Sequence, residues 1–174
     1  MFAPQTSFSP VARSNRASRL AAHLCFNAKQ SSHYDIGRFG EILAIAMFED
    51  AGFKTFKPRD LHCGDVHAVS RITGEIFTVE VKTSCYSEAY KRWQFGLYRA
   101  KKCDVRNAAY VLLLLIAEKT VFTYLLPSQV LGNRVSLDIK APPETYRGIA
   151  APYRQRDSLS FDVCNEVYSQ RLLH

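Results

Sequence analysis

The sequence lacks any apolar run long enough to cross a bilayer, and it lacks the cysteine spacing of a disulfide framework or a zinc ribbon. Its longest strongly apolar run, Val111 to Ala117, is far shorter than the roughly 20 residues of a spanning helix. The cysteines are five in number, without a CxxC pair: Cys25, Cys63, Cys85, Cys103 and Cys164. We therefore expect no membrane partner and a reducing, intracellular, cytoplasmic setting, with nucleoid association or a phage origin left open.

Acidic residues are missing from the first 34 positions, which are rich in Ser and Ala and contain the basic residues Arg16 and Arg19. Two interpretations stay open for this segment: an organellar transit peptide, or a cationic helix that contacts nucleic acid. Over the whole chain, 23 Lys and Arg residues face 16 Asp and Glu residues, giving a net charge of +7 and a pI near 9.3. Such a surplus favours polyanionic partners, above all nucleic acid.

The rest of the composition is that of a globular protein. Of 174 residues, 47% are hydrophobic and 22% are charged, and no internal repeat is evident. We expect an α/β fold with a mixed sheet flanked by helices. Three segments are expected: a basic N-terminal segment at 1–33, a core at 34–131 and a coil-rich C-terminal extension at 132–174.

Helical spacing of apolar residues predicts helices over 12–28 and 37–51, with Gly52 as a stop and Glu41 in the first turn of the second helix. A short terminal helix is expected around 164–172. Strands are predicted over 53–56, 65–70, 75–83, 93–98, 109–116 and 120–126. The segment 93–98 is expected to be a third strand of the same sheet as the hairpin.

The strands 65–70 and 75–83 form a predicted hairpin around Gly74. Alternation in the second strand puts Glu80 and Lys82 on one face and the apolar residues on the other. With the turn centred between residues 72 and 73, Asp65 lies opposite Glu80. A shift of the centre by one residue keeps Asp65 on the same face.

Glu41, Asp65, Glu80 and Lys82 would then share one small volume if the predicted helix packs beside the hairpin. Two carboxylates about 4 Å apart repel by about 4 kcal/mol at an effective dielectric near 20, so a cation should neutralise them. Hard oxygen ligands suit Mg²⁺, with Mn²⁺ able to substitute. Two simpler explanations remain: Glu80 and Lys82 could decorate a solvated strand face, and Glu41 could stabilise a helix dipole.

At these residues the sequence resembles the PD-(D/E)xK nuclease superfamily. Within it, the stretches GRFGEILAIAMFEDAGF, FTVEVKTS, RWQFGLY and VFTYLLPSQVL look most like homing endonucleases associated with group I introns and Holliday junction resolvase-like proteins. The resemblance covers roughly 34–131 and implies a restriction-endonuclease-like core. Gly64 stands where the motif has proline.

The resemblance implies hydrolysis of DNA phosphodiester bonds by a metal-activated water. Asp65, Glu80 and the backbone carbonyl of Val81 would be metal ligands, Lys82 the catalytic lysine, and Glu41 a ligand of a second metal or of its waters. A homodimer is expected, because cutting both strands needs two sites. The alternative is a catalytically inactive nuclease fold that binds nucleic acid.

Basic and polar residues around this centre are candidates for binding nucleic acid: Arg16, Arg19, His67, Lys91, Arg92, Gln94, Arg99, Lys101 and Lys102. The aromatic residues Trp93 and Phe95 either stack on bases or form a structural pair on one strand face. His62, Cys63 and His67 could instead be transition-metal ligands, although no second ligand pair completes a zinc site. The preferred substrate, a specific duplex site or a four-way junction, is left open.

Overall fold

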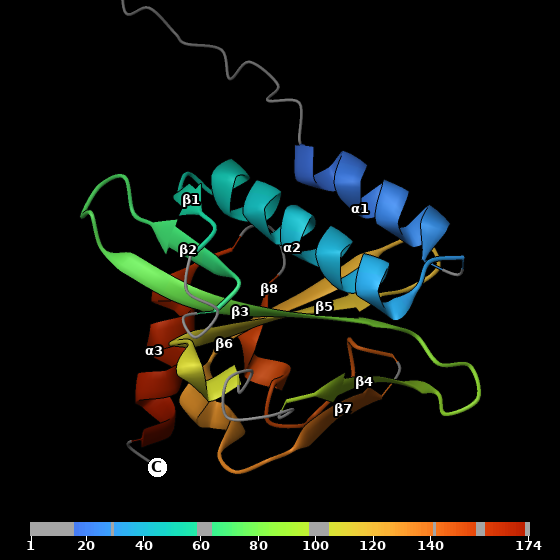
Figure 1. The fold of residues 1–174 in the computed structure, drawn as a ribbon. Helices are drawn as coiled ribbons and strands as arrows, with labels where there is room; N and C mark the ends of the chain where they lie inside the picture. The colour runs from blue at the N-terminus through green and yellow to red at the C-terminus, as the bar shows by residue number, and fades with distance from the viewer. Residues whose placement is uncertain are drawn as a thin grey trace, which may run out of the picture.

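The computed structural model describes residues 16–28, 30–58, 64–97, 105–140, 142–155 and 159–172. A six-stranded mixed sheet, the main sheet, forms the centre of the fold, with strand order β1-β2-β3-β5-β6-β8. Helices α1 and α2 lie side by side over one face of this sheet, and a two-stranded ribbon of β4 and β7 lies on the other side (Figure 1). The expected mixed sheet flanked by helices is confirmed.

The elements have these bounds: α1 Arg16–Asn27, α2 His33–Asp50, β1 Lys54–Phe56, β2 Val66–Val69, β3 Ile76–Cys85, β4 Arg92–Gly96, β5 Tyr110–Ile116, β6 Val121–Pro127, β7 Ser136–Lys140, β8 Arg154–Gln155 and α3 Phe161–Leu172. Short 3-10 helices span Val105–Asn107, Ser128–Leu131 and Ala151–Tyr153. None of the helices in these described parts of the chain is long and apolar enough to cross a membrane.

Helix α2 begins at His33, earlier than the predicted start at Gly37. Ser32 caps it: the Ser32 hydroxyl accepts a hydrogen bond from the Asp35 backbone N–H at 3.2 Å. The first turn therefore contains Asp35, and the prediction that it contains Glu41 is wrong. Because the dipole acts mainly within the first turn, it does not account for Glu41.

Helix α2 packs closely on β3 because residue 40 has no side chain. A Cβ atom built on Gly40 would collide with the Thr83 side chain of β3. The apolar residues around this contact belong to a core cluster that includes Leu43 of α2 and Val79 and Val81 of β3. The glycine thus sets the distance between the helix and the main sheet.

The predicted register of the hairpin is confirmed. Val66 of β2 pairs with Val79 of β3, as expected for a turn centred between residues 72 and 73. On its other edge β3 pairs in parallel with β5, with Glu80 opposite Val111 and Lys82 opposite Leu113. Paired residues point to the same face, so Glu80 and Lys82 lie on the face away from α2.

Strand β4 does not belong to the main sheet, and the prediction that 93–98 is a third strand of that sheet is wrong. The free edge of β3 is taken by β5, so β4 pairs with β7 instead. Trp93 and Phe95 are 2% exposed and pack in a second core cluster between the ribbon and the main sheet. Trp93 also donates a hydrogen bond from Nε1 to the Ile116 carbonyl oxygen at 2.8 Å. The interpretation of the two as a structural pair is confirmed.

The C-terminal part holds more structure than expected. Strand β7 pairs with β4, and β8 pairs with β6 at the edge of the main sheet. The prediction of a coil-rich C-terminal extension is wrong for β7 and β8. These strands are too short to give a clear alternating pattern in the sequence. Helix α3 begins at Phe161, whose ring stacks on Phe77 with centroids 4.0 Å apart.

Candidate active site

Asp65 enters the site through the turn into β2. Its backbone N–H donates to the Val79 carbonyl oxygen at 2.9 Å, and its Oδ2 accepts a hydrogen bond from the Val81 N–H at 2.8 Å. Gly64 has φ +84°, and a Cβ there would lie 2.7 Å from the Val79 oxygen. Proline holds φ near −65°, so it cannot occupy this position, which explains the departure from the motif physically.

The surroundings of the Asp65 carboxyl group disfavour its charged form. Burial first, and then the charges of Glu80 and Glu41, raise its pKa from 3.8 to about 6, against the opposing effects of the Val81 N–H and of Lys82. Asp65, Glu80 and Lys82 are therefore close enough to act on one another. Such a perturbed carboxyl beside other charges is typical of functional sites.

Glu80 and Lys82 form an ion pair on the face of β3 that points away from α2. The Lys82 Nζ donates to Glu80 Oε1 at 2.6 Å, and both side chains are largely shielded from solvent. The hydrogen bond neutralises one carboxylate of the site with the ammonium group of its own strand.

Glu41 is placed differently from the other three. Helix α2 covers the opposite face of the main sheet, and Glu41 Oε2 accepts a hydrogen bond from Lys57 Nζ at 2.8 Å. The structure therefore does not gather Glu41 and Glu80 on one face. Glu41 is nevertheless near enough to help raise the pKa of Asp65.

Lys57 is a site residue that the sequence analysis missed. Its hydrogen bond to Glu41 and the Glu41 charge raise the pKa of its ammonium, with a smaller contribution from Asp65, while burial and Arg38 oppose the rise. One signal could have revealed it, because Lys57 directly follows the predicted strand 53–56, which pairs with the strand that Asp65 precedes.

The donors suit a hard divalent cation by their chemistry, since they are carboxylate oxygens with an excess of negative charge at Asp65. Among the residues the structure describes, however, no three His, Cys, Asp or Glu side chains are grouped so as to hold a metal ion. Instead, the Glu80 carboxylate pairs with the Lys82 ammonium, and the Glu41 carboxylate pairs with the Lys57 ammonium. A cation at Asp65 and Glu80 would have to take the place of the Lys82 hydrogen bond.

The candidate residues for binding nucleic acid are spread over both sides of the main sheet. Arg16 and Arg19 lie on α1, where Arg16 pairs with Glu49 of α2 at 2.9 Å. Half-buried His67 lies on β2, opposite Thr78 of β3. His62, Cys63, Tyr98, Arg99, Lys101 and Lys102 lie outside the described residues.

Three further candidates belong to the turn before β4 and to β4 itself. Exposed Lys91 pairs with Glu88 at 2.9 Å. Arg92 pairs with Asp138 of β7 at 2.7 Å, and Gln94 is exposed on the same face of β4 as Arg92. The Arg92 and Gln94 side chains are on the outer face of the ribbon, opposite the buried pair Trp93 and Phe95.

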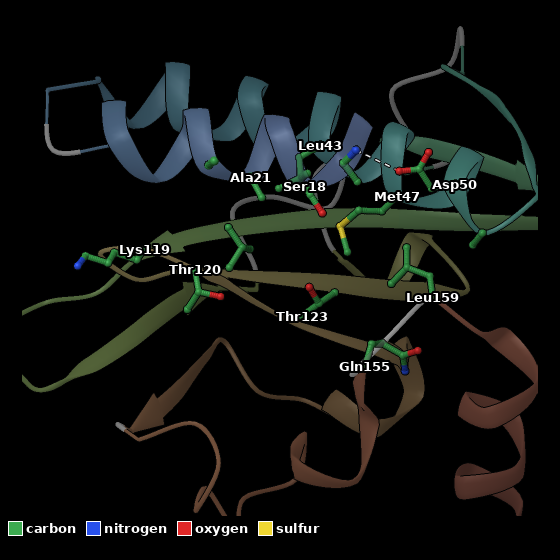
Figure 2. A pocket seen from close by; sticks show the side chains of 14 residues that line it. Ser18, Ala21, Leu43, Met47, Asp50, Lys119, Thr120, Thr123, Gln155 and Leu159 are labelled. Atoms are coloured by element: carbon green, nitrogen blue, oxygen red, sulfur yellow. Dashed lines mark hydrogen bonds between the residues drawn. The ribbon is translucent and has the colours of Figure 1, made fainter. Parts of the chain in front are cut away.

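Two cavities lie away from the cluster of Asp65, Glu80 and Lys82. The first, about 440 Å³, lies between α1, α2 and β6. Figure 2 shows Met47, Thr123 and Gln155 around it, with Asp50 bonded to the Ala17 N–H at its edge. The second, about 430 Å³, is lined by residues including Cys25, Cys85 and Trp93. Neither contains Asp65, Glu80 or Lys82.

No protein-family model and no curated protein matches the chain. A solved structure does: the bacterial homing endonuclease I-Ssp6803I, with a TM-score of 0.61 and 17% sequence identity. The match covers 83% of this chain and 99% of that one. The chain has a nuclease-like fold. The expectation for the fold class is thus confirmed, whereas the domain boundaries at 33 and 131 and the roles of the site residues stay predictions.

Proposed function

We propose that this protein is a metal-dependent DNA endonuclease with a PD-(D/E)xK active site. The observation that carries the proposal is the register of the β2–β3 hairpin, which brings Asp65 near Glu80 and Lys82. Burial, followed by the charge of Glu80, raises the pKa of Asp65 there to about 6. The likeness of the fold to that of a homing endonuclease supports it.

Each residue has a role that follows from its chemistry. Asp65 and Glu80, with the Val81 carbonyl, would hold Mg²⁺ or Mn²⁺, and Glu41 would support this centre from α2. The ion would act as a Lewis acid and lower the pKa of a water. Lys82 can exchange its hydrogen bond with Glu80 for one to a phosphate oxygen, where its charge stabilises the transition state.

The partner proposed is duplex or branched DNA, and the active form proposed is a homodimer with one site for each strand. The net charge of +7 favours a polyanion. If about six phosphates are contacted, the logarithm of the binding constant should fall against the logarithm of salt concentration with a slope near −5.

The test is cleavage by purified protein in Mg²⁺ of supercoiled plasmid, a linear duplex and a four-way junction. Lys82→Ala should lower the rate by about 100-fold or more while DNA binding stays intact. Lys119→Ala, at an exposed lysine of the β5–β6 turn, is the matched control and should cut like the wild type. If Lys82→Ala cuts at the wild-type rate, the assignment of the site is wrong.

A second candidate function is a nuclease fold that binds nucleic acid without cutting it. The pairing of Lys82 with Glu80 and of Lys57 with Glu41 favours this candidate, because both carboxylates already have cationic partners. Thermal unfolding with and without Mn²⁺ separates the two functions. No stabilisation by Mn²⁺, together with DNA binding and no cleavage, would establish the binding protein.

A further inference from the structure

The β4–β7 ribbon presents a polar face to its surroundings. Along each strand, the residues between the buried apolar ones are exposed or half-buried. The register places them side by side across the two strands: Arg92 with Lys140, Gln94 with Asp138, and Gly96 with Ser136. A two-stranded ribbon fits the major groove of B-DNA, and amide, guanidinium and ammonium groups are the donors that read base edges there.

The structure of the described residues does not explain the identity of two residues on this face, Gln94 and Gly96. The Gln94 side chain, unlike its backbone N–H, makes no hydrogen bond to any described residue. Gly96 does not adopt a positive φ, and a Cβ at this position would have nothing within 4 Å. Neither the backbone nor the packing therefore requires glycine here, and a glycine in a strand often marks the close approach of another molecule.

Arg92 is already oriented on this face. Its guanidinium bonds to Asp138 of the neighbouring strand at 2.7 Å and lies over the Tyr90 ring, 5.2 Å from its centroid. A guanidinium held in this way loses less side-chain entropy when it binds a base.

The ribbon is also tied to the strand of the candidate active site. The Gln94 N–H donates to Ser84 Oγ at 3.2 Å. Ser84 follows Lys82 by two residues on the same face of β3, about 7 Å along the strand. DNA whose phosphate reaches Lys82 would therefore have neighbouring base pairs beside the ribbon.

We propose that the outer face of the β4–β7 ribbon reads DNA sequence in the major groove, with Gln94 as a specificity-determining residue and Gly96 as the point of closest approach. This inference rests on the proposed function, because it takes DNA as the substrate. It adds that the protein selects its duplex by base sequence within a few base pairs of the scissile phosphate.

The test uses a duplex library with a randomised central stretch. DNA bound in EDTA is recovered and sequenced, and the ends produced in Mg²⁺ are sequenced separately. The wild type should enrich a base pattern, and Gln94→Ala should relax the preference at one or two adjacent positions by about tenfold. Gln30→Ala, an exposed glutamine between α1 and α2, is the matched control and should keep the wild-type pattern.

Gly96→Val gives an independent readout. Valine suits an exposed strand position and has room here, so the variant should melt like the wild type but bind the enriched duplex at least about tenfold more weakly. A wild type without base preference in its bound DNA, or an unchanged pattern for Gln94→Ala, overturns the inference. A preference in bound DNA without cleavage overturns the proposed endonuclease and leaves the ribbon as the reading element.

Discussion

The two faces of β3 show how one strand combines stability with chemistry. On the face toward α2, Val79 and Val81 are buried, and Gly40 lets the helix approach Thr83 directly. On the other face, Glu80 and Lys82 form a shielded ion pair beside a carboxyl with a raised pKa. The comparison teaches that a strained charge cluster can persist where the opposite face of the same strand is tightly packed.

The largest stability effect should come from breaking the packed face. Gly40→Ala forces α2 away from Thr83 and should lower the free energy of unfolding by about 3 kcal/mol, the upper end of overpacking costs. The melting temperature should fall by roughly 10 °C. Gly37→Ala is the matched control, since a Cβ there meets nothing within 4 Å, and helix propensity should make it slightly more stable. An unchanged melting temperature for Gly40→Ala would show that residue 40 does not limit the approach of α2.

A substitution beside the charged face of β3 should raise the stability of the protein, whereas Gly40→Ala lowers it. Because the folded-state pKa of Asp65 is raised to about 6 from 3.8, the folded protein binds more protons between these values, and its stability falls as pH rises through this window. Asp65→Asn removes this loss and keeps an oxygen acceptor for the Val81 N–H. The variant should be more stable than the wild type at pH 8, by at most about 3 kcal/mol. The gain should vanish near pH 3, and a gain equal at both pH values would assign it to another cause.

Mg²⁺ should stabilise the charged face of β3 in a way that depends on pH. A carboxylate must lose its proton to bind a cation, so stabilisation by Mg²⁺ should grow as pH rises through about 6. At ten times the dissociation constant the gain is about 1.4 kcal/mol. Calorimetric unfolding of the wild type and Asp65→Asn at pH 5 and pH 8 measures it. An equal gain in Asp65→Asn would place the ion elsewhere.

The smallest change in stability is expected from the exposed ion pair of Lys57 with Glu41. Lys57 is mostly exposed in its ion pair with Glu41, so Lys57→Ala should change the free energy of unfolding by less than about 1 kcal/mol. Chemical denaturation, with Lys119→Ala as the reference, checks this value. A larger loss would mean that the pair holds α2 against β1.

The sequence could predict what depends on local alternation. The period of two along 75–83 predicts the face of Glu80 and Lys82, and the register follows once the turn is centred between residues 72 and 73. It could not place β4, because Trp93 and Phe95 alternate in the same way in either sheet and only the parallel pairing of β3 with β5 excludes the edge. Lys57 was missed for a related reason: its contact with Glu41 joins a strand end to a helix and has no local pattern.

The parallel pairing of β3 with β5 has a consequence for how the chain folds. The β2–β3 and β5–β6 hairpins each connect neighbouring strands, so they can close early. Joining them requires β5 to return to β3 after the chain has passed through β4, and this step carries the larger loop-closure entropy. We therefore expect the β2–β3 hairpin to close first, so that Asp65 and Glu80 meet before β5 pairs with β3.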